Sequence, residues 1–213
     1  YMLRWIVLLI GATACLSVQA STNLTELSEN GIQEWEPKVF SGEWTYSINQ
    51  SKGRLALQAL SNNSASGLVL KKPIDLAATP YLNWSWLVEK TLTPLNERSK
   101  SGDDFVARIY VVIDGGLLVW NSKAVNYVWS GSSARGASWG NAYLPKNAQM
   151  LAVRGKQDKP GVWVTEKRNV RVDFQKLYGV DIQAIDGVAL MTDSDNSGGE
   201  AAAKDGDIFF SAQ

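Results

Sequence analysis

Short runs in which apolar and polar residues alternate recur along most of the chain. Each run is rich in β-branched or aromatic residues and is bounded by Gly, Pro, Asn or Asp, which is the pattern of β-strands joined by turns. Long helical periodicity and fixed-period repeats are absent from the sequence, which argues against a solenoid or propeller. One short helix, Phe174–Tyr178, is expected before the helix stop signal Gly179. The expected strands are Thr45–Ile48, Arg54–Leu60, Gly67–Leu76, Tyr81–Glu89, Phe105–Asp114, Ala124–Ser130, Met150–Arg154, Trp163–Asp173, Ile185–Asp193 and Asp207–Ser211.

These strands predict an all-β fold in which two antiparallel sheets pack as a β-sandwich, with at most one or two short helices. Within Phe105–Asp114, the odd-numbered positions form an unbroken apolar face that belongs in the core. The opposite face carries Arg108 next to Tyr110. An arginine in the middle of a strand is either a partnered cation under a loop or part of a binding surface, and both interpretations stay open.

The segment Trp163–Asp173 places Glu166 and Arg168 side by side among valines. Because an unpaired buried charge is costly, we expect each to pair with the other or with a residue on a neighbouring strand. Together with Arg108, these two residues would form one polar patch on a sheet face.

The first twenty residues have the features of a secretory signal peptide. Arg4 precedes the apolar run Trp5–Ile10, and small residues lead up to Ala20. We therefore expect a signal peptide at 1–20, a flexible lead-in at 21–34, a single domain at 35–213 and a periplasmic or secreted protein. The apolar run is too short for a transmembrane span. Cleavage before Cys15 is the alternative, and it would give a lipid-anchored outer-membrane lipoprotein.

The amino-acid composition argues against several classes of function. Lys+Arg and Asp+Glu number 21 each, so the basic footprint of a nucleic-acid partner is missing. The absence of His excludes Ser-His-Asp, Cys-His and His-metal chemistry. No phosphate loop, dinucleotide fingerprint or nucleophile elbow is present, so catalysis would have to use carboxylates, Lys, Tyr or Arg.

An acidic segment near the C-terminus resembles the opening of a calcium-binding loop. The twelfth position of an EF-hand must be a bidentate Glu, but here it is Lys204, so the EF-hand interpretation fails. A turn between the last two strands still offers several carboxylates to one Ca²⁺ ion. The alternative is that Asp, Asn, Ser and Gly are simply residues that turns prefer. The candidate ligands are Asp193, Asp195, Asp205 and Asp207.

Aromatic and acidic side chains indicate a candidate sugar-binding site. The sequence has nine Trp, and Trp129 and Trp139 flank a polar, Gly-rich loop that cannot bury them alone. Sugars stack a C–H face on aromatic rings and bind their hydroxyls to carboxylates, amides or guanidinium groups. Asp103 and Asp104 stand at the mouth of a predicted strand, and Asp104 shares a face with Arg108.

Several motifs, in order, resemble a bacterial family known as domain of unknown function 3047. The resemblance spans nearly all of residues 35 to 213 and implies an exported protein with a jelly-roll-like sandwich, similar to galactose-binding and carbohydrate-binding modules. It implies no catalytic residues. The motifs are Asp103-Asp104-Phe105, Arg108-Ile109-Tyr110-Val111-Val112, Asn126-Tyr127-Val128-Trp129-Ser130, Glu166-Lys167-Arg168-Asn169-Val170, and the acidic stretch from Met191 to Ile208.

Three functions follow as hypotheses. The first is an extracytoplasmic module that binds a glycan or a related polar ligand through Asp104, Arg108, Trp129, Glu166 and Arg168. The second is a glycan hydrolase or lyase that uses Asp104 and Glu166, which requires their carboxyl groups to face each other across a cleft at about 5 to 9 Å. The third is a structural or interaction protein of the cell envelope. Binding is favoured over catalysis, because no residue set compels a reaction.

Overall fold

The computed structural model describes residues 20–25, 27, 32–43, 45–92, 94–116 and 121–213. The expected signal peptide lies outside these residues apart from Ala20, and so does Cys15. Among the described residues, no helix is long and apolar enough to cross a membrane.

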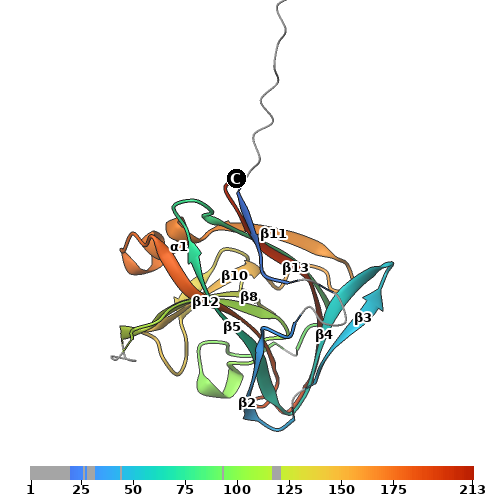
Figure 1. Ribbon diagram of the computed structural model, residues 1–213. Coiled ribbons are helices and arrows are strands. Elements are labelled where there is room, and N and C mark those ends of the chain that lie inside the picture. Colours follow the sequence, from blue (N-terminus) through green and yellow to red (C-terminus); the bar gives the residue numbers. More distant parts are fainter. Residues whose placement is uncertain (1–19, 26, 28–31, 44, 93, 117–120) are drawn as a thin grey trace, which may run out of the picture.

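Two β-sheets form the body of the molecule (Figure 1). In the described chain, the first sheet consists of β1 (Ser21–Asn23), β3 (Tyr46–Ser51), β4 (Arg54–Asn62), β6 (Tyr81–Lys90), β11 (Val164–Asn169) and β13 (Glu200–Ser211), in the order β11-β6-β13-β4-β3 with β1 on β13. The second consists of β2 (Glu36–Ser41), β5 (Ala65–Asp75), β7 (Arg108–Ile113), β8 (Lys123–Trp129), β9 (Ser138–Gly140), β10 (Ala148–Arg154) and β12 (Ala184–Asp193), in the order β2-β5-β12-β7-β8-β10-β9.

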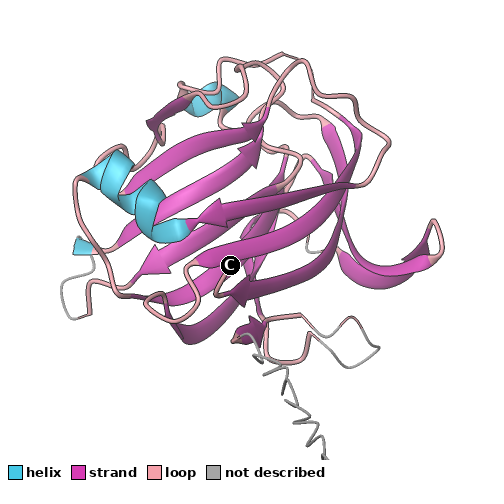
Figure 2. Cartoon of the chain, turned by 90° about the horizontal axis from the view of Figure 1, so that it is seen from above, coloured by secondary structure: helices cyan, strands magenta, loops and turns pink. Residues whose placement is uncertain are grey.

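The predicted all-β sandwich is confirmed, with one departure from antiparallel pairing. β10 runs parallel to β8, because the chain crosses over through a loop and the short strand β9 between them. The helix α1 (Val170–Tyr178) lies against the outside of the strands, and a 3₁₀ turn, η1 (Lys100–Gly102), precedes β7 (Figure 2).

The helix begins earlier than the sequence pattern predicts. The predicted strand 163–173 ends at Asn169, whose side-chain Oδ1 accepts a hydrogen bond from the Val172 amide and caps the helix. Val170 and Phe174, four residues apart, are buried against the core. The β-branched residues Val170 and Val172 predicted a longer strand. The segment is helical instead, because Asn169 caps it and Val170 and Phe174 pack against the core. Gly179 ends the helix at φ 70°, as predicted.

Two further boundaries differ from the prediction. The lead-in was expected to be flexible, but Ser21–Asn23 pairs with β13, and the Trp35 indole donates a hydrogen bond to the Leu24 carbonyl. β13 begins at Glu200 instead of Asp207, because Ala201 and Ala203 point into the core despite their weak strand preference. Asp205 and Asp207 therefore lie within a strand and not in the acidic turn.

Large aromatic side chains fill the space between the sheets. Trp84 and Trp86 of β6 contact each other edge to face at 5.4 Å. Trp84 stacks on Tyr127 of β8 at 5.4 Å, and Trp86 contacts Trp129 of the same strand at 5.9 Å. Aromatic contacts thus join the two sheets across the core, where burial of each ring stabilises the fold.

Candidate ligand-binding cleft

A cleft of about 580 Å³ lies on the outer face of the second sheet. The floor of the cleft is hollow because several of its residues have small side chains or none. These are Ala65 and Gly67 of β5, Ala189 of β12 and Ala148 of β10. At Gly67 a Cβ atom would lie 2.5 Å from the Leu190 carbonyl oxygen, so only glycine allows the close pairing of β5 and β12. The hollow therefore follows from residue size on this face.

The strand register orders the floor into rows. Asp193 lies opposite Ala65 at one end of the cleft. The next row contains Gly67, Met191 and Arg108, and the following one contains Val69, Ala189, Tyr110 and Asn126. Val112 lies one row further, opposite Ala124 of β8, which pairs with Ala148 of β10 on its other side. With about 3.3 Å per residue, the six steps from Asp193 back to Gly187 span about 20 Å.

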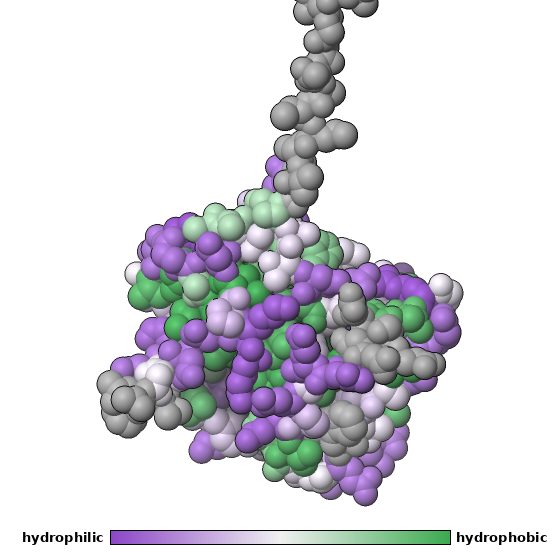
Figure 3. All heavy atoms as spheres, viewed as in Figure 1, coloured by the Kyte–Doolittle hydropathy of each residue, from purple (hydrophilic) through white to green (hydrophobic). Residues whose placement is uncertain are grey.

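Exposed apolar side chains form the walls. Phe40 of the edge strand β2 is 62% exposed on one side. Tyr143 and Leu144, in the loop between β9 and β10, are 49% and 59% exposed on the other side. On the face of the molecule in Figure 3, hydrophobic atoms lie between bands of hydrophilic atoms.

Arg108 is the buried cation of the cleft floor. Its Nη2 donates to Asp193 Oδ2, and its Nη1 lies 3.9 Å from Asp103 Oδ2. Its Nε and Nη1 are buried and have no hydrogen-bond partner among the described residues. Asn126 Oδ1 is in the same situation, whereas its amide Nδ2 donates to Met150 Sδ at 3.1 Å. Buried donors and an acceptor thus lie beneath the floor without a hydrogen bond to the described residues.

Burial dominates the electrostatics of this end of the cleft. It raises the pKa of Asp193 to about 7, against the opposing effect of Arg108. Burial also raises the pKa of Asp103, again opposed by Arg108 and by the hydrogen bond from Asn141. For Arg108, burial lowers the pKa, but Asp193 and the other neighbouring groups together raise it by more, so the guanidinium stays charged.

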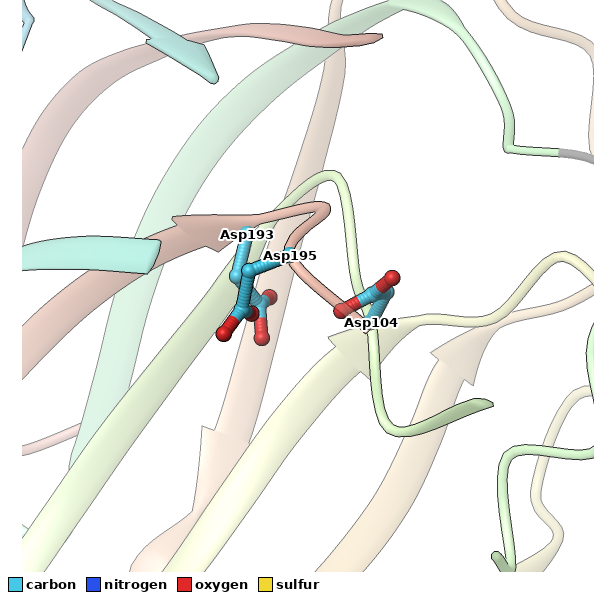
Figure 4. Close-up of side chains that lie close together, drawn as sticks. All are labelled: Asp104, Asp193 and Asp195. Atoms are coloured by element: carbon cyan, nitrogen blue, oxygen red, sulfur yellow. The ribbon is translucent and has the colours of Figure 1, made fainter. Parts of the chain in front are cut away.

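Asp104, Asp193 and Asp195 form a carboxylate cluster in which one oxygen of each lies within 4.8 Å of the others. Figure 4 shows Asp193 and Asp195 at the end of β12 and Asp104 on a neighbouring loop. Asp104 accepts hydrogen bonds from the amides of Asn196 and Ser197, and Asp193 accepts one from the Phe105 amide.

The fit of this cluster to Ca²⁺ is poor. Ca²⁺ takes six to eight oxygen ligands, whereas Asp104 already serves two backbone amides and Asp193 serves Arg108 and an amide. The other two candidates are elsewhere: Asp205 is buried in β13 and Asp207 is exposed on it. Asp104 and Asp193 hold the loops at the cleft end in place, as turn residues do.

Glu166 and Arg168 lie in the other sheet, so the expected single patch with Arg108 does not form. Glu166 of β11 accepts a hydrogen bond from Arg154 Nε, and Arg135 Nη2 lies 3.7 Å away. Arg168 donates through Nε to Asp173 Oδ2 at 2.9 Å, and the same oxygen accepts from the Tyr127 hydroxyl. Each residue has a partner, as the cost of unpaired charge predicts. Asp104 leads into β7 of the second sheet, so the two carboxylates of the hydrolase hypothesis come from different sheets.

Trp129 is not at the rim of a ligand site. It is 1% exposed and packs in the core against Trp86. Trp139 is 8% exposed, stacks on Phe105 and donates to the Glu97 carbonyl. The polar loop between them could not bury these rings alone, but the buried Glu97 carboxylate fixes it by accepting from Ser130 Oγ, Ser133 Oγ and the amides of Gly131 and Ser132.

Of the predicted ligand residues, Arg108 lines the cleft and Asp104 supports one end of it. The acids Asp193 and Asp195 line the cleft as well. Other lining residues, among them Phe40, Asn126, Asn141 and Tyr143, were not predicted as ligand residues. Tyr110 and Asn126 could have been predicted from the alternation of apolar and polar residues, because they lie on the same outward face as Arg108. Phe40 and Tyr143 carried no such signal, since their positions depend on an edge strand and a loop.

The profile of the family described as "Protein of unknown function (DUF3047)" matches residues 33–209. The chain belongs to this family. No curated protein matches the sequence significantly.

The fold of this DUF3047 protein is similar to those of solved carbohydrate-binding proteins. The family 30 carbohydrate-binding module of a cellulosomal cellulase of Clostridium thermocellum aligns with a TM-score of 0.54 at 10% identity, covering 91% of this chain and 98% of that one. A winged bean acidic lectin complexed with methyl-α-D-galactose aligns with a TM-score of 0.44 at 14% identity, covering 91% and 98%. The likeness to the first establishes the jelly-roll-like sandwich, as the sequence predicted.

Proposed function

We propose that this DUF3047 protein is a binding module that holds a glycan in the cleft on the outer face of its second sheet. One observation carries the proposal: a single cleft combines exposed aromatic side chains, Phe40 and Tyr143, with the polar groups of Arg108, Asp195 and Asn196. Aromatic faces suit the C–H face of a sugar, and polar groups suit its hydroxyls.

The fold likeness to carbohydrate-binding modules supports the proposal only as an analogy, since one fold hosts many functions. The residues of the cleft therefore carry the argument. Binding is favoured over hydrolysis, because the nearest candidate acids, Asp103, Asp104 and Asp193, are engaged by Asn141, by backbone amides or by Arg108.

A glycan array with a cleft-filling variant tests this function. Ala189→Phe places a ring on the cleft floor, and Ala202→Phe makes the same change on the outer face of the first sheet. We expect wild type and Ala202→Phe to bind the same glycans, whereas Ala189→Phe loses binding and keeps the wild-type circular dichroism spectrum. Equal binding by both variants would rule out this cleft as the glycan site.

We also propose that the module works outside the cytoplasm. The support is the leader at residues 1–20, with its basic Arg4 and apolar run. Mass spectrometry of the protein after expression in a bacterium tests this: a mature N-terminus at Ser21 is expected. A diacylglyceryl modification on Cys15 would instead identify a membrane-anchored lipoprotein, and an unprocessed leader would contradict export.

A further inference from the structure

The cleft is polar at one end and apolar at the other. Arg108, Asp193, Asp195 and Asn196 belong to the rows and loops where β7 begins and β12 ends. Tyr143 closes this end, because its hydroxyl lies 3.4 Å from Asn196 Oδ1 and 3.3 Å from the Lys100 carbonyl.

The other end presents mainly hydrocarbon. Val69, Ala189 and Val112 form the floor there. Ala148 and Leu144 continue it at the side, since the Ala148 amide donates to the Leu144 carbonyl at 2.8 Å. Leu144 is nevertheless 59% exposed. This end of the cleft therefore keeps an apolar surface in contact with water.

Polar groups at this end point elsewhere. The Tyr110 hydroxyl donates to Met191 Sδ at 3.4 Å, which directs it toward the polar end. Asn126 Nδ2 donates to Met150 Sδ, and Asn126 Oδ1 lies buried beneath the floor, out of reach of a ligand. A sugar ring has hydroxyls around its whole rim, and hydroxyls that lose water against Val69, Val112 and Leu144 would have few partners, which disfavours binding. An unsubstituted sugar chain therefore fits only the polar half.

We propose that the ligand of this cleft is a glycan with an alkyl or acyl substituent, whose sugar lies at the Arg108–Asp195 end and whose hydrocarbon part lies over Val69, Val112 and Leu144. This inference rests on the proposed glycan-binding function and specifies its ligand class. The matching of polarity along the cleft supports it: sugar hydroxyls meet charged and amide groups, and the hydrocarbon covers the apolar end, which is the favourable pairing for both.

Two glucosides that differ only in the aglycone test the inference. We would measure the affinities of n-octyl β-D-glucoside, kept below its micelle-forming concentration, and methyl β-D-glucoside by isothermal titration calorimetry. Each buried methylene contributes about fourfold in affinity, so the octyl compound should bind at least tenfold tighter. A negative heat-capacity change on binding should accompany the gain.

Two matched variants locate the gain. Leu144→Ser introduces a hydroxyl at the apolar end and should shrink the octyl-to-methyl affinity ratio at least threefold. Val172→Ser makes a comparable change at an equally exposed residue, 58%, on α1 away from the cleft and should leave the ratio unchanged. Equal affinities for the two glucosides, or an octyl gain that Leu144→Ser does not reduce, would overturn the inference. The glycan array reports on the proposed function separately, since Ala189→Phe can abolish array binding whichever glucoside ratio is found.

Discussion

The two faces of the second sheet use aromatic residues in opposite ways. On the inner face, Tyr127 and Trp129 of β8 are 0% and 1% exposed and pack against Trp84 and Trp86. On the outer face, Tyr143 and Phe40 stand at the rim of the cleft, 49% and 62% exposed. These three tryptophans, of a residue type readily associated with sugar binding, stabilise the core, and a tyrosine and a phenylalanine are available to a ligand.

Within β8, strand parity decides the role of each side chain. This strand alternates Val125, Tyr127 and Trp129 with Asn126 and Val128. Its large side chains therefore point into the core, and the Asn126 side chain points toward the cleft.

Trp129→Ala should have the largest effect on stability. Removing a fully buried indole leaves a cavity between the sheets, and such changes cost about 3–5 kcal/mol. The urea midpoint should fall accordingly, and a milder Trp129→Phe change should recover part of the loss. If Trp129→Ala instead kept its stability and lost only glycan binding, the face assignment would be reversed.

Asp205→Asn should change how stability depends on pH. Burial raises the pKa of Asp205 from 3.8 to about 7. Between these values Asp205 is ionised in the unfolded chain and protonated in the folded one. The contribution of Asp205 to the free energy of unfolding is therefore fully present below about pH 4 and is lost by about 1.4 kcal/mol per pH unit as the pH rises toward 7.

The Asp205→Asn variant removes this contribution, so its urea midpoint should decline less than that of wild type between pH 4 and 8. Asp207→Asn, at an exposed position of the same strand, is the matched control and should follow the wild-type curve. A wild-type profile without any decline attributable to Asp205 would show that its carboxyl group is not buried in this way.

Tyr143→Ala should weaken binding of the array-identified glycan about tenfold, or about 1.4 kcal/mol, because the ring is the exposed aromatic beside the polar end. Its effect on the melting temperature should be small, since surface substitutions usually change stability by less than about 0.5 kcal/mol. Calorimetry and a thermal melt on the same preparation check both parts. An unchanged affinity would remove Tyr143 from the site.

The smallest effect is expected from metal. Because Asp104 and Asp193 are already bonded to amides and to Arg108, melts in EDTA and in excess Ca²⁺ should coincide. A reversible upward shift with Ca²⁺ would show a site, because a ligand that binds only the folded state stabilises it. Asp195→Ala would then be expected to remove the shift.

The sequence was sufficient for the sandwich and for most strands, because alternation is strong where one face is buried, as in Ile109 and Val111 of β7. It failed where other physics decided: the Asn169 cap turned a valine-rich strand end into a helix. Similarly, alanines in β13 extended a strand into the expected acidic turn. In the cleft, Arg108 and the Asp193–Asp195 turn were identified, but their neighbours Phe40 and Tyr143 come from distant segments that only the folded chain brings together.

The proposed function requires the ligand to bind on the outer face of the second sheet. Amide NMR spectra recorded while the array-identified glycan is added test it most directly. The shifted amides should cluster on β2, β5, β7 and β12 around Gly67, Arg108 and Ala189, and in the loop at Tyr143. Shifts centred instead on β6 and β11, near Glu166 and Arg168, would place the ligand on the first sheet and contradict the claim.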